Sequence, residues 1–261
     1  MAKALADSNA DIIALQEIYE DSHVNNLLQG LKGVYPYSAR MNNQHFWQFH
    51  NGLLFLSKYP IIKSETIKHK KSAIIESIMA SKSMQRVEVN TPFGEMLFVN
   101  MHTTAGGYDP ESKEADSIRE SELAEAISIC KEYSEVEGNR EAIIFGDMNM
   151  GPEASNANYE YVKSSGFKDE VITALEKDGG ETCTWSPENI LNKGGVHNHC
   201  PPQRCDHLFL QDTSAFTVTS AQLFMKDAFI TCTQSKRQSN GQTEMITLSD
   251  HYGLNVVITE K

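Results

Sequence analysis

One short apolar run, from Ile143 to Gly146, followed by Asp147-Met148-Asn149, constrains the fold of this chain more than any other stretch. An apolar segment that stops at a glycine is typical of a buried strand that ends in a turn. Side chains alternate along an extended backbone, so Asp147 and Asn149 are expected on the same side of it. An Asp-x-Asn sequence also favours an Asx-type turn, and this alternative stays open for the isolated motif. The run predicts a buried strand with a carboxylate and an amide at its end.

Polar groups of similar chemistry flank four apolar runs of the sequence. α/β proteins commonly build their sites from functional groups at the ends of core strands. Carboxylate oxygens suit Mg²⁺ or Mn²⁺, and an imidazole that titrates near neutral pH suits general base catalysis on a water. The pattern fits phosphoester hydrolysis assisted by a hard divalent cation. The groups are Glu17, His102, Asp147 with Asn149, and the pair Asp250-His251.

Hydrophobic periodicity predicts one mixed α and β domain over residues 1–261, in which strands outnumber helices. A hairpin is expected at 85–101, because Thr91-Pro92-Phe93-Gly94 separates two alternating segments. No repeat, linker or low-complexity tract divides the chain. Helices are expected at 1–10 (the tail of one), 20–31, 111–133 and 154–165, other strands at 11–17, 51–61, 141–146, 206–211, 215–224 and 254–259, and a loop at 176–203.

The composition narrows the class of partner. A net charge of −12 argues against tight binding of nucleic acid through a basic surface. It does not exclude a nuclease, because a metal ion can neutralise phosphate locally. No 18-residue apolar stretch predicts a transmembrane helix, and the first residues lack the apolar core of a signal peptide. A cytoplasmic or secreted location is therefore expected.

The cysteines are odd in number and scattered, since there are 5 of them in 261 residues. His197, His199, Cys200 and Cys205 superficially resemble a zinc cluster. Their spacing matches no common zinc finger, so reduced thiols are expected instead.

Six short motifs together resemble the endonuclease/exonuclease/phosphatase superfamily, which includes deoxyribonuclease I, abasic-site endonucleases, inositol phosphatases and neutral sphingomyelinases. They occur in the family's order and cover nearly the whole chain. The resemblance implies a four-layer α/β sandwich with two packed, mostly antiparallel sheets flanked by helices. The motifs are Leu15-Gln16-Glu17, Ser57-Lys58-Tyr59-Pro60, Asn100-Met101-His102, Gly146-Asp147-Met148-Asn149, Arg204-Cys205-Asp206 and Ser249-Asp250-His251.

The same resemblance implies a metal site and a general base. Glu17 would be the metal ligand, with Asp250 near the metal, which would be Mg²⁺ or Mn²⁺. His251 would take a proton from the attacking water, and Asp206 would pair with it and fix its tautomer.

Three further roles follow from the matched motifs. Asp147 would orient or activate the attacking water, and Asn149 would hold a phosphoryl oxygen. His102 would donate a hydrogen bond to a phosphate oxygen and so stabilise the transition state.

Within the superfamily, the neutral sphingomyelinases are most similar. Thr184-Trp185, the run from Asn189 to Asn192, and Arg204-Cys205-Asp206 resemble their pattern of Thr-Trp, Asn-x-Leu-Asn and Arg-x-Asp. This implies hydrolysis of sphingomyelin to ceramide and phosphocholine, with a phospholipid headgroup at a membrane surface as the substrate. The acidic charge also suits a zwitterionic headgroup better than a polyanion. Another phosphoesterase of the superfamily, such as an endonuclease or inositol phosphatase, and a catalytically impaired headgroup-binding homologue remain alternatives.

The chain departs from the family pattern at its start. Family members begin with a core strand that ends in an Asn that helps to hold the metal. No such Asn precedes Glu17, since Asn9 lies at the end of a predicted helix. We therefore expect either an N-terminally truncated form that lacks the first strand, with unpaired backbone groups on its neighbours, or an impaired site. Phe46-Trp47-Gln48-Phe49 is a candidate for membrane contact, although such a cluster between strands is more often core.

Overall fold

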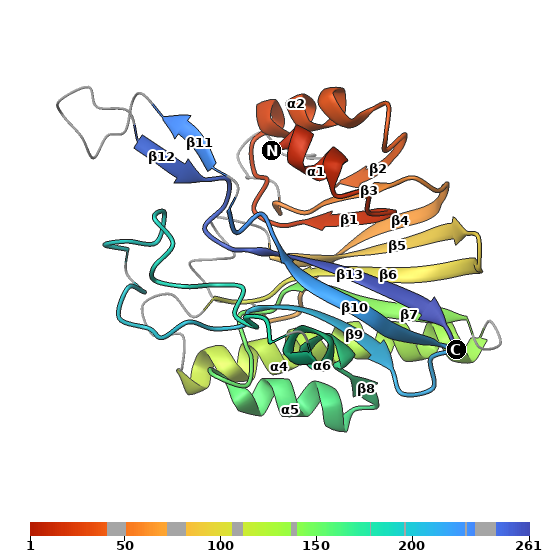
Figure 1. The fold of residues 1–261 in the computed structure, drawn as a ribbon. Helices are drawn as coiled ribbons and strands as arrows, with labels where there is room; N and C mark the ends of the chain where they lie inside the picture. The colour runs from red at the N-terminus through yellow and green to blue at the C-terminus, as the bar shows by residue number, and fades with distance from the viewer. Residues whose placement is uncertain are drawn as a thin grey trace.

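Two β-sheets lie face to face at the centre of the structure, and helices cover their outer sides (Figure 1). The structure is a computed structural model. It confirms the mixed α/β sandwich that the sequence predicts. It describes residues 1–40, 51–71, 82–105, 112–136, 140–177, 179–195, 197–227, 229–232 and 244–261.

The larger sheet has six strands in the order β4-β5-β6-β7-β9-β8. Its strands β6 and β7 are parallel, and every other neighbouring pair is antiparallel. Parallel neighbours need a long crossover, and the helix α4 (Lys113–Val136) lies between β6 and β7 in the chain. The strands are β4 (Ile61–Lys68), β5 (Ser83–Thr91), β6 (Gly94–His102), β7 (Glu141–Asp147), β8 (Phe167–Lys168) and β9 (Asp206–Gln211).

The second sheet is in two parts. Three strands pair in the order β1-β3-β2, and β10 pairs with β13 beside them. A separate hairpin of β11 and β12 projects from the sandwich (Figure 1). The strands are β1 (Ile12–Leu15), β2 (Tyr37–Arg40), β3 (Leu54–Ser57), β10 (Phe216–Phe224), β11 (Phe229–Cys232), β12 (Glu244–Thr247) and β13 (Gly253–Glu260).

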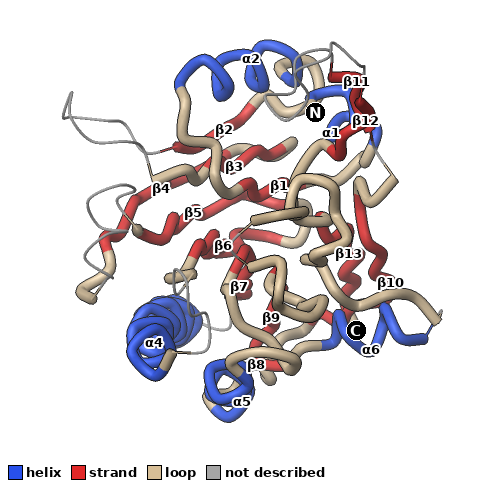
Figure 2. The backbone as a smooth tube through the Cα atoms, turned by 90° about the vertical axis from the view of Figure 1, so that its left-hand side faces the viewer, coloured by secondary structure: helices blue, strands red, loops and turns tan. Residues whose placement is uncertain are grey.

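The helices close the outer faces of the two sheets. Figure 2 shows α4 and α5 (Asn156–Ser164) below the six-stranded sheet, and α1 (Ala2–Asp7) and α2 (Asp21–Leu31) above the smaller one. A fifth helix, α6 (Glu170–Lys177), packs Val171 and Leu175 against β10. No helix in the described parts of the chain has the length and apolar character needed to span a membrane.

Apolar side chains fill the spaces between these layers. Leu123 and Ile127 of α4 pack with Val99 and Ile144 of the large sheet. Between the sheets, Phe55 of β3 packs with Val87, Phe98 and Ile143. Leu5 and Leu27 of the upper helices pack with Leu54 and Leu56. Apart from β4 and β13, the strands of the two sheets therefore carry buried apolar residues, which fix their register.

Several elements were not predicted from the sequence, and the segment predicted as an apolar strand with a turn at 51–61 contains β3, a turn and only the first residue of β4. Pro60 separates β3 from β4, which belong to different sheets, and Ser57 Oγ closes the intervening turn by accepting from Tyr59 N at 2.9 Å. The exposed strand β4 has too little apolar alternation to be recognised. The other missed elements are β2, β8, α6, β11 and β12.

Candidate active site

The register of three neighbouring strands brings most of the polar groups together. His102 of β6 lies opposite Asp147 of β7, and Asp147 lies opposite Asp206 of β9. The parallel strands β6 and β7 end at this edge, and the antiparallel strand β9 begins there. Glu17, which follows β1 in the other sheet, approaches from across the sandwich, with its Oε1 3.7 Å from His102 Nε2.

A glycine and a tight turn shape the end of β7. Gly146 has φ +136°, and a Cβ on it would lie 2.1 Å from Met101 O, so the two parallel strands can approach this closely only with glycine here. Beyond the strand, Asp147 Oδ1 accepts from Asn149 N at 3.0 Å, and Asn149 has φ 46°. The Asx-type turn is therefore present, and the expectation that both side chains project from an extended backbone is wrong. Asn149 Nδ2 instead donates to Thr103 O at 3.1 Å.

His251 is paired with a carboxylate. Its Nδ1 lies 2.9 Å from Asp206 Oδ2, and its Nε2 lies 4.0 Å from Asp147 Oδ2. Burial disfavours the imidazolium, but Asp206, Asp147 and Asp250 together outweigh burial and raise the pKa of His251 to about 10. At neutral pH without a bound cation, His251 is therefore a protonated partner of Asp206.

The carboxylates themselves are forced close together. Burial, and after it the charge of Asp206, raises the pKa of Asp147 to about 7, against the opposing effect of His251. Removal from water, followed by the charge of Asp250, raises the pKa of Glu17, although the Glu17 side chain is 56% exposed. The mutual repulsion behind part of these shifts is what a bound cation relieves.

The donor set fits a hard divalent cation. Ligand atoms of Asp147, Asp206 and His251 all lie within 4.8 Å of one another. Glu17 adds a carboxylate that is open to solvent, and the Asp250 side chain accepts from Ser249 Oγ at 3.5 Å. Carboxylate oxygens are the ligands that Mg²⁺ and Mn²⁺ prefer.

A lysine that the sequence analysis missed lies in the site. Lys82 Nζ is 3.0 Å from His102 Nε2 and donates to Thr103 O at 2.9 Å, and Lys82 is buried. Burial, followed by the charges of Lys82 and His251, holds the pKa of His102 well below its usual range. The neutral ring therefore accepts from the ammonium at Nε2. A lone lysine at the start of a strand carries no sequence signal for such a role.

The Asn-x-Leu-Asn stretch braces the loop that carries His251. Asn189 Nδ2 donates to both Ser249 O and Asp250 O at 3.0 Å, and Asn192 Nδ2 donates to Asp250 O at 2.9 Å. Thr247 Oγ1 donates to Asn189 Oδ1 at 2.7 Å, which fixes the orientation of that amide. The motif that resembles sphingomyelinases thus positions the loop of His251, and this role is independent of which substrate the site binds.

Thr184 ties the same loop to β9. Its Oγ1 accepts from the backbone N–H groups of Cys205 and Asp206, both at 3.1 Å. Its carbonyl accepts from Tyr252 N at 2.6 Å. One buried threonine therefore fixes the relative positions of Asp206 and His251.

Two further features of the sequence are a possible zinc cluster and an aromatic segment. Among the residues that the structure describes, no group of three metal-ligand atoms is formed by His197, His199, Cys200 and Cys205. The aromatic segment 46–49 lies outside the described residues.

The amide brace generates a prediction for Asn189→Ala. Two partly buried backbone carbonyls would lose a donor, of which Asp250 O keeps the one from Asn192, and we expect a cost of about 1 kcal/mol in unfolding free energy. The displaced loop would lower phosphodiester hydrolysis by about 10- to 100-fold. Chemical denaturation measures the loss of unfolding free energy, and a chromogenic phosphodiester measures the loss of hydrolysis rate. Asn198→Ala is the matched control, because Asn198 lies exposed in the loop that also holds Asn189, and its side chain accepts from Gly194 N within that loop. Equal losses in both variants would contradict a specific brace.

Known proteins share features with this chain in both sequence and fold. The family model described as Endonuclease/Exonuclease/phosphatase family matches residues 1–251. No curated protein matches the chain by sequence. Sphingomyelinase C from Streptomyces griseocarneus is a similar solved structure, with a TM-score of 0.76 at 17% identity over 98% of this chain and 89% of that chain.

Two further solved structures share the fold. A mutant beta toxin from Staphylococcus aureus with bound magnesium ions has a TM-score of 0.76 at 16% identity, over 100% of this chain and 91% of that one. A truncated TDP2 from Caenorhabditis elegans has a TM-score of 0.66 at 18% identity, over 100% and 88%. At such identities the likeness concerns the fold alone, and the family model carries the assignment. The chain belongs to the Endonuclease/Exonuclease/phosphatase family.

Proposed function

We propose that this protein is a Mg²⁺-dependent phosphodiesterase that hydrolyses sphingomyelin to ceramide and phosphocholine. The observation that carries the phosphodiesterase part is the convergence of Glu17, His102, Asp147, Asp206 and His251 at one edge of the sandwich. A single edge thus offers carboxylate ligands, a candidate base and hydrogen-bond donors. These are the groups that metal-assisted attack of water on phosphorus requires.

In the proposed mechanism His251 is the general base. Asp206 holds Nδ1 at 2.9 Å, which leaves Nε2 directed to the reacting water and orients the ring. The neutral form must be present for proton abstraction. Asp147, whose Oδ2 lies 4.0 Å from His251 Nε2, is placed to orient the same water.

Glu17, with Asp147, Asp206 and Asp250 near it, would hold the cation. A bound Mg²⁺ would polarise the phosphoryl group and stabilise developing negative charge. Asn149 and Lys82 would supply hydrogen bonds to phosphoryl oxygens. Because His102 Nε2 accepts from Lys82 Nζ, we assign the role of charged donor to Lys82 and the role of its positioning partner to His102.

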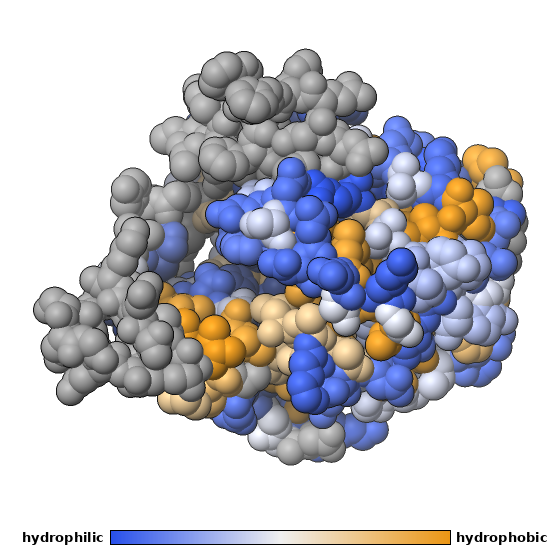
Figure 3. Space-filling model, turned by 90° about the horizontal axis from the view of Figure 1, so that it is seen from above, coloured by the Kyte–Doolittle hydropathy of each residue, from blue (hydrophilic) through white to orange (hydrophobic). Residues whose placement is uncertain are grey.

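An exposed apolar hairpin supports a lipid substrate. Phe229 and Ile230 of β11 are each 46% exposed, and Met245 of β12 is 55% exposed. Apolar side chains gather in Figure 3 at the left of the molecule, where Figure 1 has this hairpin. β12 leads directly into Ser249-Asp250-His251, so a membrane that binds the hairpin would lie next to the site. The presence of a sphingomyelinase C among the similar solved structures agrees with this choice.

Substrate panels test the proposal. Sphingomyelin vesicles, supercoiled plasmid DNA and inositol phosphates are each incubated with the protein, with and without Mg²⁺. We expect phosphocholine release that requires Mg²⁺ and exceeds the other rates. DNA nicking at a comparable rate would replace the lipid assignment with a nuclease, and no turnover of any substrate would favour a headgroup-binding homologue.

The hairpin variant Ile230→Ser separates membrane contact from chemistry. Lipid hydrolysis on vesicles should fall by about tenfold, because burial of one large apolar side chain contributes about 1.5–3 kcal/mol. Hydrolysis of a water-soluble chromogenic phosphodiester should be unchanged. Val136→Ser is the control, since Val136 is 79% exposed at the end of α4. Equal loss on both substrates would remove the hairpin from membrane contact.

For the metal, we predict that Glu17→Gln weakens the apparent Mg²⁺ affinity at least about tenfold, because a charged ligand is lost while the shape is kept. Isothermal titration of Mg²⁺ measures this without substrate. Glu20→Gln is the matched control, since Glu20 is an exposed carboxylate three residues along the chain. Wild-type Mg²⁺ affinity in Glu17→Gln would place the metal elsewhere.

The pH dependence tests the base. The rate should rise with pH through the pKa of His251, because the base acts in its neutral form. Asp206→Asn removes a charge that raises this pKa, so the acidic limb should move to lower pH while the maximal rate falls. Mg²⁺ should also lower the His251 pKa, as followed by NMR, since a cation disfavours the imidazolium. Asp212→Asn, at the other end of β9, is the control.

His251→Ala completes this prediction. Loss of a general base typically lowers the rate by about 10²–10⁴, with substrate affinity less affected. A His251→Ala protein with wild-type turnover and an unchanged acidic limb would transfer the role to His102.

A further inference from the structure

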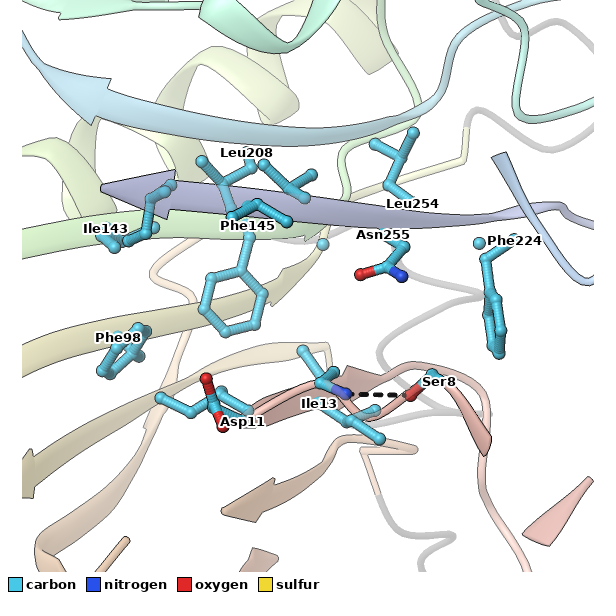
Figure 4. A pocket seen from close by; sticks show the side chains of 18 of the residues that line it. Ser8, Asp11, Ile13, Phe98, Ile143, Phe145, Leu208, Phe224, Leu254 and Asn255 are labelled. Carbon is cyan, nitrogen blue, oxygen red and sulfur yellow. Dashed lines mark hydrogen bonds between the residues drawn. The ribbon is translucent and has the colours of Figure 1, made fainter. Parts of the chain in front are cut away.

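Glu17 follows a strand that has a paired neighbour on one side and a cavity on the other. β1 pairs with β3, and Figure 4 shows the cavity of about 520 Å³ that lies between β1 and β13. Gln16 gives one tie to the facing sheet, because its Nε2 donates to Asn100 Oδ1 at 2.8 Å. Directly afterwards the chain turns, and Glu17 has φ 61°. A left-handed backbone is unfavourable for a residue with a Cβ, so this turn needs further contacts to hold it.

Gly52 supplies such contacts. Its carbonyl oxygen accepts from Ile18 N at 2.9 Å, immediately after the turn at Glu17. Gly52 has φ +74°, and a Cβ on it would lie 2.8 Å from Tyr19 Cε1 and 3.1 Å from both the N and the Cα of Glu17. The backbone of Glu17 therefore lies against the side of Gly52 that only a glycine leaves free. Any larger residue at this position would displace the Glu17 backbone.

The preceding residue, Asn51, makes a corresponding contact with the other sheet. Asn51 is buried, and its Nδ2 donates to Ser83 Oγ at 2.8 Å, while its Oδ1 accepts from Leu53 N at 3.1 Å. The bond from Leu53 fixes the orientation of the amide and so directs its donor to Ser83. Ser83 is the first residue of β5 and follows Lys82, whose Nζ lies 3.0 Å from His102 Nε2. The amide of Asn51 thus holds the backbone from which the Lys82 side chain extends.

Glu17 and Lys82 both approach the same nitrogen of His102. Glu17 Oε1 lies 3.7 Å from His102 Nε2, which Lys82 Nζ also contacts. The carboxylate follows β1 of the smaller sheet and the ammonium precedes β5 of the larger one, so their separation depends on how the two sheets are joined here. Asn51 and Gly52 share one planar peptide bond, which is stiff. Their contacts therefore connect the backbones of Glu17 and Lys82 through very few rotatable bonds.

We propose that Asn51 and Gly52 are positioning residues that set the separation of Glu17 from Lys82, and thereby both the Mg²⁺ affinity of the site and its hydrogen bond to a phosphoryl oxygen. Gly52 acts through Glu17, and Asn51 acts through Ser83 and Lys82. The inference rests on the proposed function for the roles of Glu17 and Lys82, whereas the contacts of Asn51 and Gly52 do not depend on it.

Gly52→Ala tests the first contact. We expect the Mg²⁺ affinity, measured by isothermal titration, to fall at least about tenfold, because the added Cβ displaces Glu17. In the metal-free protein, hydrogen exchange of the Ile18 amide should become at least about tenfold faster. Gly194→Ala is the matched control, since Gly194 has φ +73° and no atom of the described residues lies within 4 Å of a Cβ added there. It introduces a similar backbone strain and should leave both quantities unchanged.

Ser83→Ala and Asn51→Ala test the second contact. Ser83→Ala removes only the acceptor at the start of β5, so hydrolysis of a chromogenic phosphodiester should slow about tenfold while the Mg²⁺ affinity changes less than about twofold. A variant with both substitutions should lose no more rate than Asn51→Ala alone, because both changes break the same hydrogen bond. Additive losses in the double variant would overturn the link between Asn51 and Lys82.

Equal changes in Mg²⁺ affinity and in Ile18 exchange for Gly52→Ala and Gly194→Ala would overturn the role of Gly52. Should Gly52→Ala fail to fold, the same substitution in a Tyr19→Ala background, compared with Tyr19→Ala alone, retains only the close contact with Glu17. If the unaltered protein binds no Mg²⁺, the proposed function fails on that result alone. The exchange rate of the Ile18 amide then still decides whether Gly52 holds the turn at Glu17.

Discussion

The register of β6, β7 and β9 is the constraint on which the site depends. Since successive side chains on a strand face opposite sides, a slip of one residue in β7 would turn Asp147 away from both His102 and Asp206. Gly146 secures this register, because only a residue without Cβ can lie so close to Met101 O. The glycine that ends the apolar run is therefore required by packing, and the chemistry beside it depends on that packing.

The fold holds several carboxylates closer together than their charges favour. Glu17 and Asp147 both have raised pKa values, and the neighbouring carboxylates Asp250 and Asp206 are among the causes. The positive groups that the structure places near them are Lys82, which contacts His102 and Thr103, and His251, which is paired with Asp206. Such repulsion opposes folding, so it is typical of a site that is stabilised by a ligand cation instead of by its own side chains. Neutral amides and a threonine hydroxyl, which add no charge, position the loop of His251.

The sequence predicted the parts of the fold with strong periodicity and the parts of the site with distinctive motifs. Apolar runs located β1, β6, β7 and β9, which carry buried side chains, and also β13, whose apolar residues are only partly buried or exposed. Exposed β4 and the hairpin of β11 and β12 have no such signal. Lys82 was missed for a different reason: its neighbours in space, His102 and Thr103, are twenty residues away in the chain. The left-handed backbone conformation of Asn149 was also not predicted, because the chain turns there and the alternation of side chains along a strand no longer applies.

Two strands of the smaller sheet, β1 and β13, border the candidate active site. Glu17 follows β1, and His251 precedes β13, so the separation of these two strands sets the separation of the two side chains. Tyr252 N donates to Thr184 O at 2.6 Å, and this bond ties the start of β13 to the β9 side of the site. Gln16 Nε2, which donates to Asn100 Oδ1 at 2.8 Å, ties the end of β1, and with it Glu17, to β6 of the facing sheet.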